Sequence, residues 1–180
     1  MCYRTKLNAK IKDLEKTFDA KFIEPEAHTP REEINAFDFC RTPVITNENP
    51  EEINLYHWGL IPQWAKDENI KKMTLNGKIE TVTEKPAFRN SVKNRCLILA
   101  DGYYEWQWLD AKGKNKQKYL IYPKDQKIFA FAGIYSSWIH PENGDLINSY
   151  TILTTEANET MAKIHNTKKR MLSSSKKGRS

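Results

Sequence analysis

The second half of this 180-residue sequence is dominated by apolar and aromatic segments with the length and composition of β-strands. Four such segments occupy residues 95–109, 118–123, 127–138 and 147–155. The stretch DAKGKNK at residues 110–116 is typical of a hairpin turn and joins the first two segments. Because strands linked by short turns pair antiparallel, this half predicts a curved antiparallel sheet or barrel.

The first half adds a small amount of helix. Residues 8–22 carry apolar side chains at helical spacing with lysine and glutamate between them, which predicts an amphipathic helix. Residues 24–54 are rich in proline, asparagine and glutamate and are expected to be irregular, with a short strand at residues 43–46. A second short helix is predicted at residues 158–164. The fold class is therefore α+β and β-rich, with a barrel-like core and a few flanking helices.

Composition limits the kind of protein. The length predicts one domain, and 39% hydrophobic residues are enough for a packed core. No stretch approaches the roughly 20 apolar residues of a membrane span, and the start of the chain lacks the apolar region of a signal peptide. Three widely separated cysteines indicate a reducing cytoplasm, and no spacing indicates a metal or organic cofactor.

The net charge of +6 is concentrated at one end. Residues 161–180 hold seven lysines and arginines and no acidic residue, which leaves 22 basic against 23 acidic residues in the rest. A basic tail is a weak indication of nucleic-acid binding, and a solvated or disordered end is the better explanation. Residues 172–180, ending in SSSKKGRS, are expected to form a disordered basic tail.

The segment ADGYYEWQWL at residues 100–109 predicts a strand with two different faces, because side chains alternate along a strand. One face is aromatic: Tyr104, Trp106 and Trp108. The other is mixed: Tyr103, Glu105 and Gln107. We expect the aromatic face to be the core side. Glu105 then lies either on a solvated face or in a partly buried site, where a raised pKa would let it transfer protons near neutral pH.

Other candidate residues have two readings each. His165 is either a surface histidine or a proton-transfer group. Asn76 precedes Gly77, so its amide either holds a turn or binds a substrate. Trp58 and Trp64 fit a core, although exposed tryptophans beside basic residues also stack on unpaired bases.

Cys2 directly follows the initiator methionine. It is either a packing residue or, once Met1 is removed, a free α-amine and thiol on adjacent carbons. Such a 1,2-aminothiol condenses with aldehydes to a five-membered thiazolidine ring. Since the ordinary pKa values of the two groups are about 8 and about 8.5, reactive forms exist at neutral pH.

Five ordered motifs resemble one family, the SOS response-associated peptidase (SRAP) domain, whose members include abasic-site shields. The motifs extend from residue 1 to about residue 171: MCYR, WGLIPQWAK, NGKIET, ADGYYEW, and ILTTEAN leading to AKIHNTKKRM. The resemblance implies a SRAP-like domain over residues 1–171, with a barrel-like core and a groove for single-stranded DNA. The family continues beyond this point, so the ending LSSSKKGRS predicts a truncated C-terminus.

The resemblance also implies an activity. Met1 is lost, Cys2 becomes the N-terminus, and its aminothiol captures the ring-opened aldehyde of an abasic site as a thiazolidine crosslink that shields the lesion in the DNA damage response. By position, Cys2 matches the nucleophile and Asn76 the asparagine that orients the amine or substrate. Glu105 matches the acid–base carboxyl group and His165 the histidine beside the deoxyribose.

The remaining residues implied by the resemblance would contact DNA. Arg4 falls where the family contacts phosphate, and Lys78 stands where the family carries an arginine. Trp64 is expected to stack on or wedge against a base, and Thr155 belongs to the same DNA-binding set. The expected partner is single-stranded DNA with an abasic site, with no membrane and no obligate protein partner, in a bacterial cytoplasm with nucleoid association on DNA.

Two other functions are compatible with these residues. A cysteine-type peptidase would use Cys2, His165 and Glu105 as nucleophile, base and orienting group, with the chain's own Met1–Cys2 bond as its best-motivated substrate. A non-covalent single-stranded nucleic-acid binder would use Cys2 only for packing.

Overall fold

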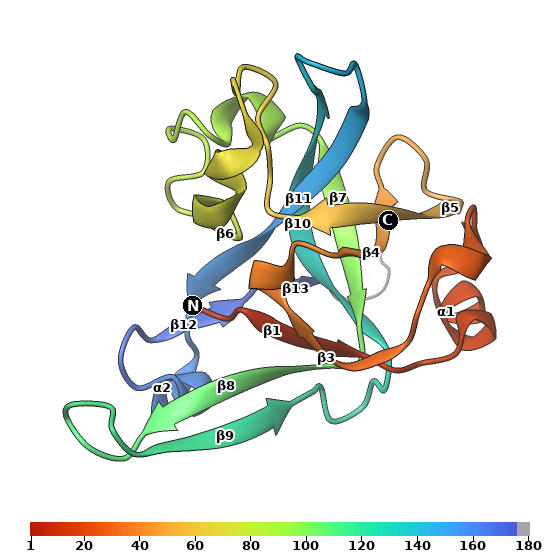
Figure 1. The fold of residues 1–180 in the computed structure, drawn as a ribbon. Coiled ribbons are helices and arrows are strands. Elements are labelled where there is room, and N and C mark those ends of the chain that lie inside the picture. The colour runs from red at the N-terminus through yellow and green to blue at the C-terminus, as the bar shows by residue number, and fades with distance from the viewer. Residues whose placement is uncertain (176–180) are drawn as a thin grey trace.

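A computed structural model describes residues 1–175 as a β-barrel with a smaller sheet beside it (Figure 1). Five strands form the ring of the barrel: β4 (Arg41–Thr46), β5 (Glu52–Trp58), β7 (Arg95–Ala100), β10 (Phe129–Ile139) and β11 (Leu146–Glu156). Four strands form the second sheet, in the order β3 (Arg31–Asn35), β1 (Arg4–Leu7), β8 (Gly102–Trp108) and β9 (Lys116–Ile121). The β-rich class with a barrel-like core is confirmed.

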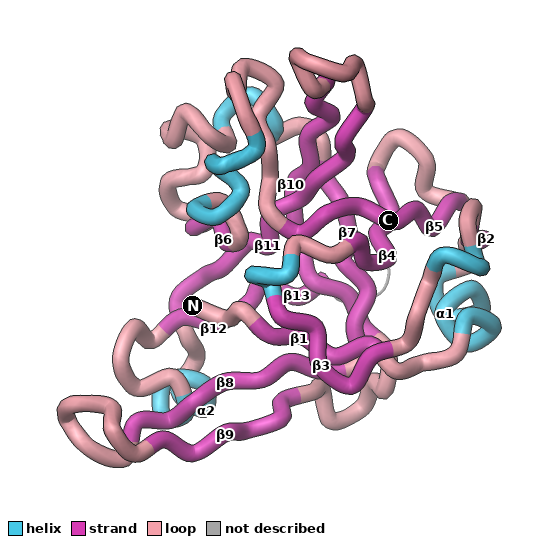
Figure 2. Tube along the Cα trace, in the orientation of Figure 1, coloured by secondary structure: helices cyan, strands magenta, loops and turns pink. Residues whose placement is uncertain are grey.

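Short strands and helices complete the fold (Figure 2). The short strands are β2 (Lys21–Phe22), β6 (Asn76–Lys78), β12 (Arg170–Leu172) and β13 (Ser174–Ser175). The α-helices are α1 (Ile11–Phe18) and α2 (Glu159–Ile164). Four 3-10 turns are η1 (Pro25–Ala27), η2 (Ala36–Asp38), η3 (Glu68–Met73) and η4 (Arg89–Ser91). No helix within residues 1–175 is long and apolar enough to cross a membrane.

The ring closes through β11, which pairs antiparallel with β10 on one edge and parallel with β5 on the other. Gly133 lets neighbouring strands come together, since a Cβ there would lie 2.4 Å from Ile98 Cδ1 and 2.6 Å from the Thr151 carbonyl oxygen. Large side chains fill the interior, among them Trp58, Phe131 and Tyr150, each at most 1% exposed. Burial of this apolar surface is the main stabilising contribution to the barrel.

Most of the predicted elements are present, with two differences in the first half. The first helix ends at Phe18, because Asp19 adopts the left-handed conformation at φ 53° and terminates it. The expectation that residues 24–54 are mostly irregular is wrong, since β3 and the start of β5 lie there as well as β4. The hairpin turn at residues 110–116 is confirmed by the antiparallel pairing of β8 with β9.

The C-terminal region contains the second helix, α2, and the two short strands β12 and β13. α2 begins where expected, and the Asn158 side chain caps it by accepting a hydrogen bond from the Met161 amide at 2.9 Å. The predicted tail covers residues 172–180. Its first residue, Leu172, belongs to β12, and Ser174–Ser175 form β13, which pairs with β10. The remainder of that tail, residues 176–180, lies outside the described residues.

The two faces of β8 are the reverse of the expectation. Tyr103 and Glu105 are 6% and 4% exposed, whereas the aromatic face is only half-buried. The reason is α2, which packs on the mixed face: Tyr103 Oη lies 3.3 Å from Met161 Sδ, and Gln107 donates to the Lys163 carbonyl at 2.9 Å. Glu105 is therefore a buried carboxyl group, not a solvated one.

Candidate active site

The beginning of the chain is enclosed by β-strands, with the N-terminus near β1, β6 and β12 (Figure 1). Pairing of Thr5 in β1 with Tyr103 in β8 fixes this position. Cys2 is 2% exposed, and its thiol donates to the carbonyl oxygens of Arg4 at 3.3 Å and Tyr104 at 3.4 Å. The N-terminal segment is thus a packed part of the structure, and Cys2 is held by backbone groups of β1 and β8.

Asn76 reaches Cys2 from the other side. β6 pairs parallel with β11, with Asn76 opposite Ile152, so the side chain is held by the barrel itself. Its Nδ2 donates to the Cys2 carbonyl oxygen at 2.9 Å. Its Oδ1 is buried and has no hydrogen-bond partner within the described residues. A buried acceptor without a donor is unfavourable, which makes this oxygen suited to receive an incoming N–H group.

Glu105 is the acidic group of the site. Burial raises the pKa of Glu105 to about 7, although the Met1 ammonium group and the Cys2 thiol act in the opposite direction. Burial, and then the Glu105 carboxylate, raise the pKa of the Cys2 thiol well above its ordinary value. Glu105 can therefore gain or lose a proton near neutral pH, and the thiol is predominantly protonated.

His165 follows α2 and faces the terminal amine. Its Nε2 lies 3.2 Å from the Met1 nitrogen, and its Nδ1 donates to the Arg170 carbonyl oxygen at 2.8 Å. With the proton on Nδ1, Nε2 is free to accept a proton from the amine. Burial lowers the pKa of His165 and also that of the Met1 amine. Both changes favour the neutral forms, in which the imidazole can accept a proton beside the terminal amine.

Arg170 is a supporting residue that the sequence did not reveal. Its backbone carbonyl receives the His165 hydrogen bond, and its guanidinium group donates to Thr154 Oγ1 at 3.0 Å and to the Thr154 carbonyl oxygen at 2.7 Å. The same guanidinium pairs with Glu80 at 2.8 Å. These contacts attach β12 to β11 beside His165. The only sequence indication was the position of Arg170 within the motif AKIHNTKKRM.

The four predicted DNA-binding residues do not form one contact cluster. Arg4 pairs with Glu33 and lies against the aromatic face of β8, with its Cζ 5.8 Å from the Trp106 ring centroid. Trp64 is 53% exposed, and its indole N–H donates to the Pro86 carbonyl at 3.2 Å. Lys78 is exposed at the end of β6, and Thr155 is half-buried in β11 opposite Met171. Of these four residues, Lys78 in β6 and Thr155 in β11 lie on neighbouring strands, near Asn76.

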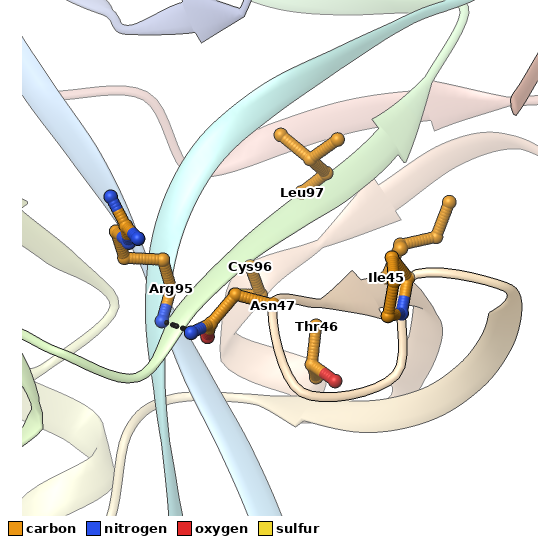
Figure 3. Close-up of a pocket in the computed structure, with 7 residues that line it drawn as sticks. Ile45, Thr46, Asn47, Arg95, Cys96 and Leu97 are labelled. Carbon is orange, nitrogen blue, oxygen red and sulfur yellow. Dashed lines mark hydrogen bonds between the residues drawn. The ribbon is translucent and has the colours of Figure 1, made fainter. Parts of the chain in front are cut away.

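A separate pocket lies between β4 and β7 (Figure 3). It is lined mainly by Ile45, Thr46, Cys96 and Leu97, and it contains none of the predicted site residues. Cys96 is buried, and burial raises the pKa of its thiol, which disfavours the reactive thiolate. Within residues 1–175, no three histidine, cysteine, aspartate or glutamate side chains are grouped closely enough to hold a metal ion.

Taken together, these features describe a β-barrel protein with a second sheet, in which Cys2 is held by β1 and β8 on one side and by Asn76 of β6 on the other, with Glu105 and His165 beside the first two residues of the chain. The chain belongs to the SOS response associated peptidase (SRAP) family, whose model matches residues 1–178. It is 38% identical over 167 residues to abasic site processing protein YoqW of Bacillus subtilis, covering 92% of this chain and 73% of that one.

Other relatives match over shorter regions. Abasic site processing protein YoaM of Bacillus subtilis is 44% identical over 123 residues, which span 68% of this chain and 53% of that protein. Abasic site processing protein HMCES of Xenopus tropicalis is 35% identical over 130 residues, or 60% of this chain and 38% of that protein. A crystal structure of a Bacteroides thetaiotaomicron protein superimposes with a TM-score of 0.89 at 34% identity, covering 98% of this chain and 78% of that one.

Proposed function

We propose that this protein recognises abasic sites in single-stranded DNA and forms a thiazolidine crosslink with them through Cys2 after Met1 is removed. The observation that carries the proposal is the convergence of Asn76, Glu105 and His165 on the first two residues of the chain. The names of three relatives, each an abasic site processing protein, support the same class of substrate.

Removal of Met1 is the first step. Hydrolysis of the Met1–Cys2 peptide bond consumes one water molecule, releases methionine and leaves the α-amine on Cys2. The new amine remains beside the Cys2 carbonyl that Asn76 holds, and the Asn76 Oδ1 is available to accept one of its hydrogens. The site is thereby prepared to present an amine and a thiol from the same residue.

Capture of the sugar follows. The abasic deoxyribose is mostly a closed hemiacetal, and a proton-transfer group is needed to open it to the aldehyde. Glu105, with a pKa of about 7, fits this role, and His165 is a second proton acceptor, beside the terminal amine. The neutral amine adds to the aldehyde, loss of one water gives the Schiff base, and the thiol adds across its C=N bond to close the ring. No oxidant or reductant is required.

Single-stranded DNA is expected to bind across the surface that surrounds this site. Arg4 and Lys78 would contact phosphates on the two sides of the lesion. Trp64, with more than half of its side chain exposed, would stack on a neighbouring base, and Thr155 would contact the strand near Lys78.

The peptidase alternative is supported only for the chain's own Met1–Cys2 bond. A cysteine peptidase uses a thiolate with a lowered pKa, whereas burial and Glu105 raise the pKa of the Cys2 thiol. His165 hydrogen-bonds the Met1 amine, and the thiol donates to two backbone carbonyls. The imidazole is therefore engaged by the terminal amine and not by the thiol, which disfavours general peptide hydrolysis.

A denaturing gel tests the proposal. The purified protein, with loss of Met1 verified by mass spectrometry, is incubated with a single-stranded oligonucleotide that contains one abasic site. We expect a covalent band that is absent with undamaged DNA and absent with Cys2→Ala. A Cys96→Ala variant serves as the matched control and should crosslink normally. A covalent band that persists in Cys2→Ala would exclude the thiazolidine mechanism.

A further inference from the structure

The β8–β9 hairpin extends away from the barrel (Figure 1). One of its sides carries half-buried aromatic rings and basic side chains. We define the hairpin face as Tyr104, Trp106 and Trp108 of β8 with Lys116 and Lys118 of β9. The register places Lys118 opposite Trp106 and Lys116 opposite Trp108, so all five side chains lie on the same side of the hairpin. Since α2 packs on the opposite side, this face is not covered by helix.

Cations lie over each aromatic ring. The Lys118 ammonium is 4.2 Å from the Tyr104 centroid and 5.5 Å from that of Trp106, and the Lys116 ammonium is 5.2 Å from that of Trp108. The turn adds Lys112 and Lys114, and its one acidic residue, Asp110, accepts hydrogen bonds from the backbone of the same turn. The hairpin thus carries rings and positive charge in alternation, which is the chemistry that binds single-stranded nucleic acid.

The hairpin face is continuous with the candidate active site. Arg4, two residues after Cys2, lies over the Trp106 ring, and the Cys2 thiol donates to the backbone of Tyr104. Arg4 and Lys118 both pair with the carboxylate of Glu33. The Glu33 carboxylate therefore holds two cations where the hairpin face meets the candidate active site. A DNA phosphate group could pair with the same two cations.

We propose that the hairpin face docks the undamaged part of the same DNA strand, on one side of the abasic site. This inference rests on the proposed function for its choice of DNA and extends it to a second contact region. Bases stack on Trp106 and Trp108, and the lysines that now cover these rings move to the phosphates. The exchange is favourable because stacking on an exposed ring is stronger than an exposed cation–π contact, and the lysines keep a charged partner.

Binding of undamaged DNA is the test, since it involves no covalent bond and its result is independent of Cys2 chemistry. The probes are fluorescein-labelled oligo(dT) strands of about 6 and about 16 nucleotides, the range of lengths that small single-strand binding surfaces contact. Fluorescence anisotropy is measured at several salt concentrations. The variants are Lys116→Gln/Lys118→Gln, Trp108→Ala and Trp108→Phe. The control is Lys12→Gln/Lys16→Gln on α1, which removes the same charge from exposed positions elsewhere.

We expect the hairpin lysine variant to bind the longer strand roughly five- to tenfold more weakly, and to lower the slope of log K against log salt by about 1.4, for two lost phosphate contacts. Trp108→Ala should weaken binding by about fivefold or more, and Trp108→Phe should restore most of it. The control variant should retain the salt slope. Equal binding and equal salt slopes in the hairpin and control variants would overturn the inference. The proposed function would fail separately, by the absence of a Cys2-dependent covalent band.

Discussion

Asn76 connects the beginning of the chain to the barrel through a single side chain. Its amide N–H group holds the Cys2 carbonyl, and its buried oxygen has no partner within the described residues. We expect Asn76→Ala to slow crosslinking roughly tenfold, since one hydrogen bond to the reacting residue contributes about 1 to 1.5 kcal/mol. A time course on denaturing gels measures the rate, with loss of Met1 followed by mass spectrometry. Asn54→Ala, on β5, is the control, and an unchanged rate for Asn76→Ala would exclude the positioning role.

For single residues, the sequence indicated candidate side chains for the site but not their surroundings. Asn76 is followed by glycine and resembles a turn residue, yet pairing of β6 with β11 makes it part of a strand. The sequence was compatible with Glu105 on a solvated face or in a partly buried site. The packing of α2 on β8 shows that it is buried. The unpartnered oxygen of Asn76 and the hydrogen bond of His165 to Arg170 depend on contacts between distant segments, which local sequence does not encode.

At the element scale, β12 determines the position of His165. The Arg170 guanidinium reaches Thr154 of β11 with two hydrogen bonds, a geometry that needs the planar group of arginine. We expect Arg170→Lys to lower the free energy of unfolding by about 1–2 kcal/mol and to slow crosslinking severalfold, because the carbonyl that orients His165 is less firmly held. Urea unfolding and the gel assay measure the two effects.

A matched substitution controls for the loss of a guanidinium group as such. Arg41 pairs with Glu24 at 3.4 Å on the surface, where ion pairs contribute little. Arg41→Lys should therefore change neither stability nor crosslinking by a comparable amount. If both variants behave alike, Arg170 has no special role at the site.

Elements with strong local signals were the most predictable. The β8–β9 hairpin and α2 have turn residues and a cap at the expected positions, and both form there. β3 was missed because residues 31–35 contain two adjacent glutamates and little apolar character. The faces of β8 were reversed because three large aromatic side chains suggest a core, whereas here lysines cover them on the outside.

At the scale of the whole molecule, closure of the barrel joins segments about a hundred residues apart. β5 pairs parallel with β11, a contact that short turns do not produce and that the alternation of side chains does not indicate. The sequence predicted a barrel-like antiparallel core, and this parallel junction completes it. The same closure brings β6 beside β11 and so supplies Asn76 to a site whose other members come from the two ends and the middle of the chain.

The buried carboxyl group of Glu105 links the proposed activity to the stability of the whole molecule. Its folded pKa of about 7 lies above the ordinary value of 4.5, so folding favours the protonated form. The contribution of Glu105 to stability is fully present below about pH 4.5 and is lost as the pH rises through about 7. Glutamine has nearly the same shape and never ionises. Glu105→Gln should therefore match the wild type in stability near pH 4 and exceed it near pH 8, by at most about 3 kcal/mol.

Urea unfolding of both proteins at the two pH values measures this difference. Comparison of the pair removes the opposing effect of His165, whose pKa burial lowers. Glu156→Gln, at an exposed position of β11, is the control.

The same Glu105→Gln protein should crosslink abasic DNA more slowly, because it lacks the group that opens the hemiacetal. A stabilised but slow variant would mean that the molecule retains a destabilising buried carboxylate for its chemistry. A difference in stability that does not change between the two pH values would show that Glu105 titrates as an ordinary carboxyl group and would remove the basis for its proton-transfer role.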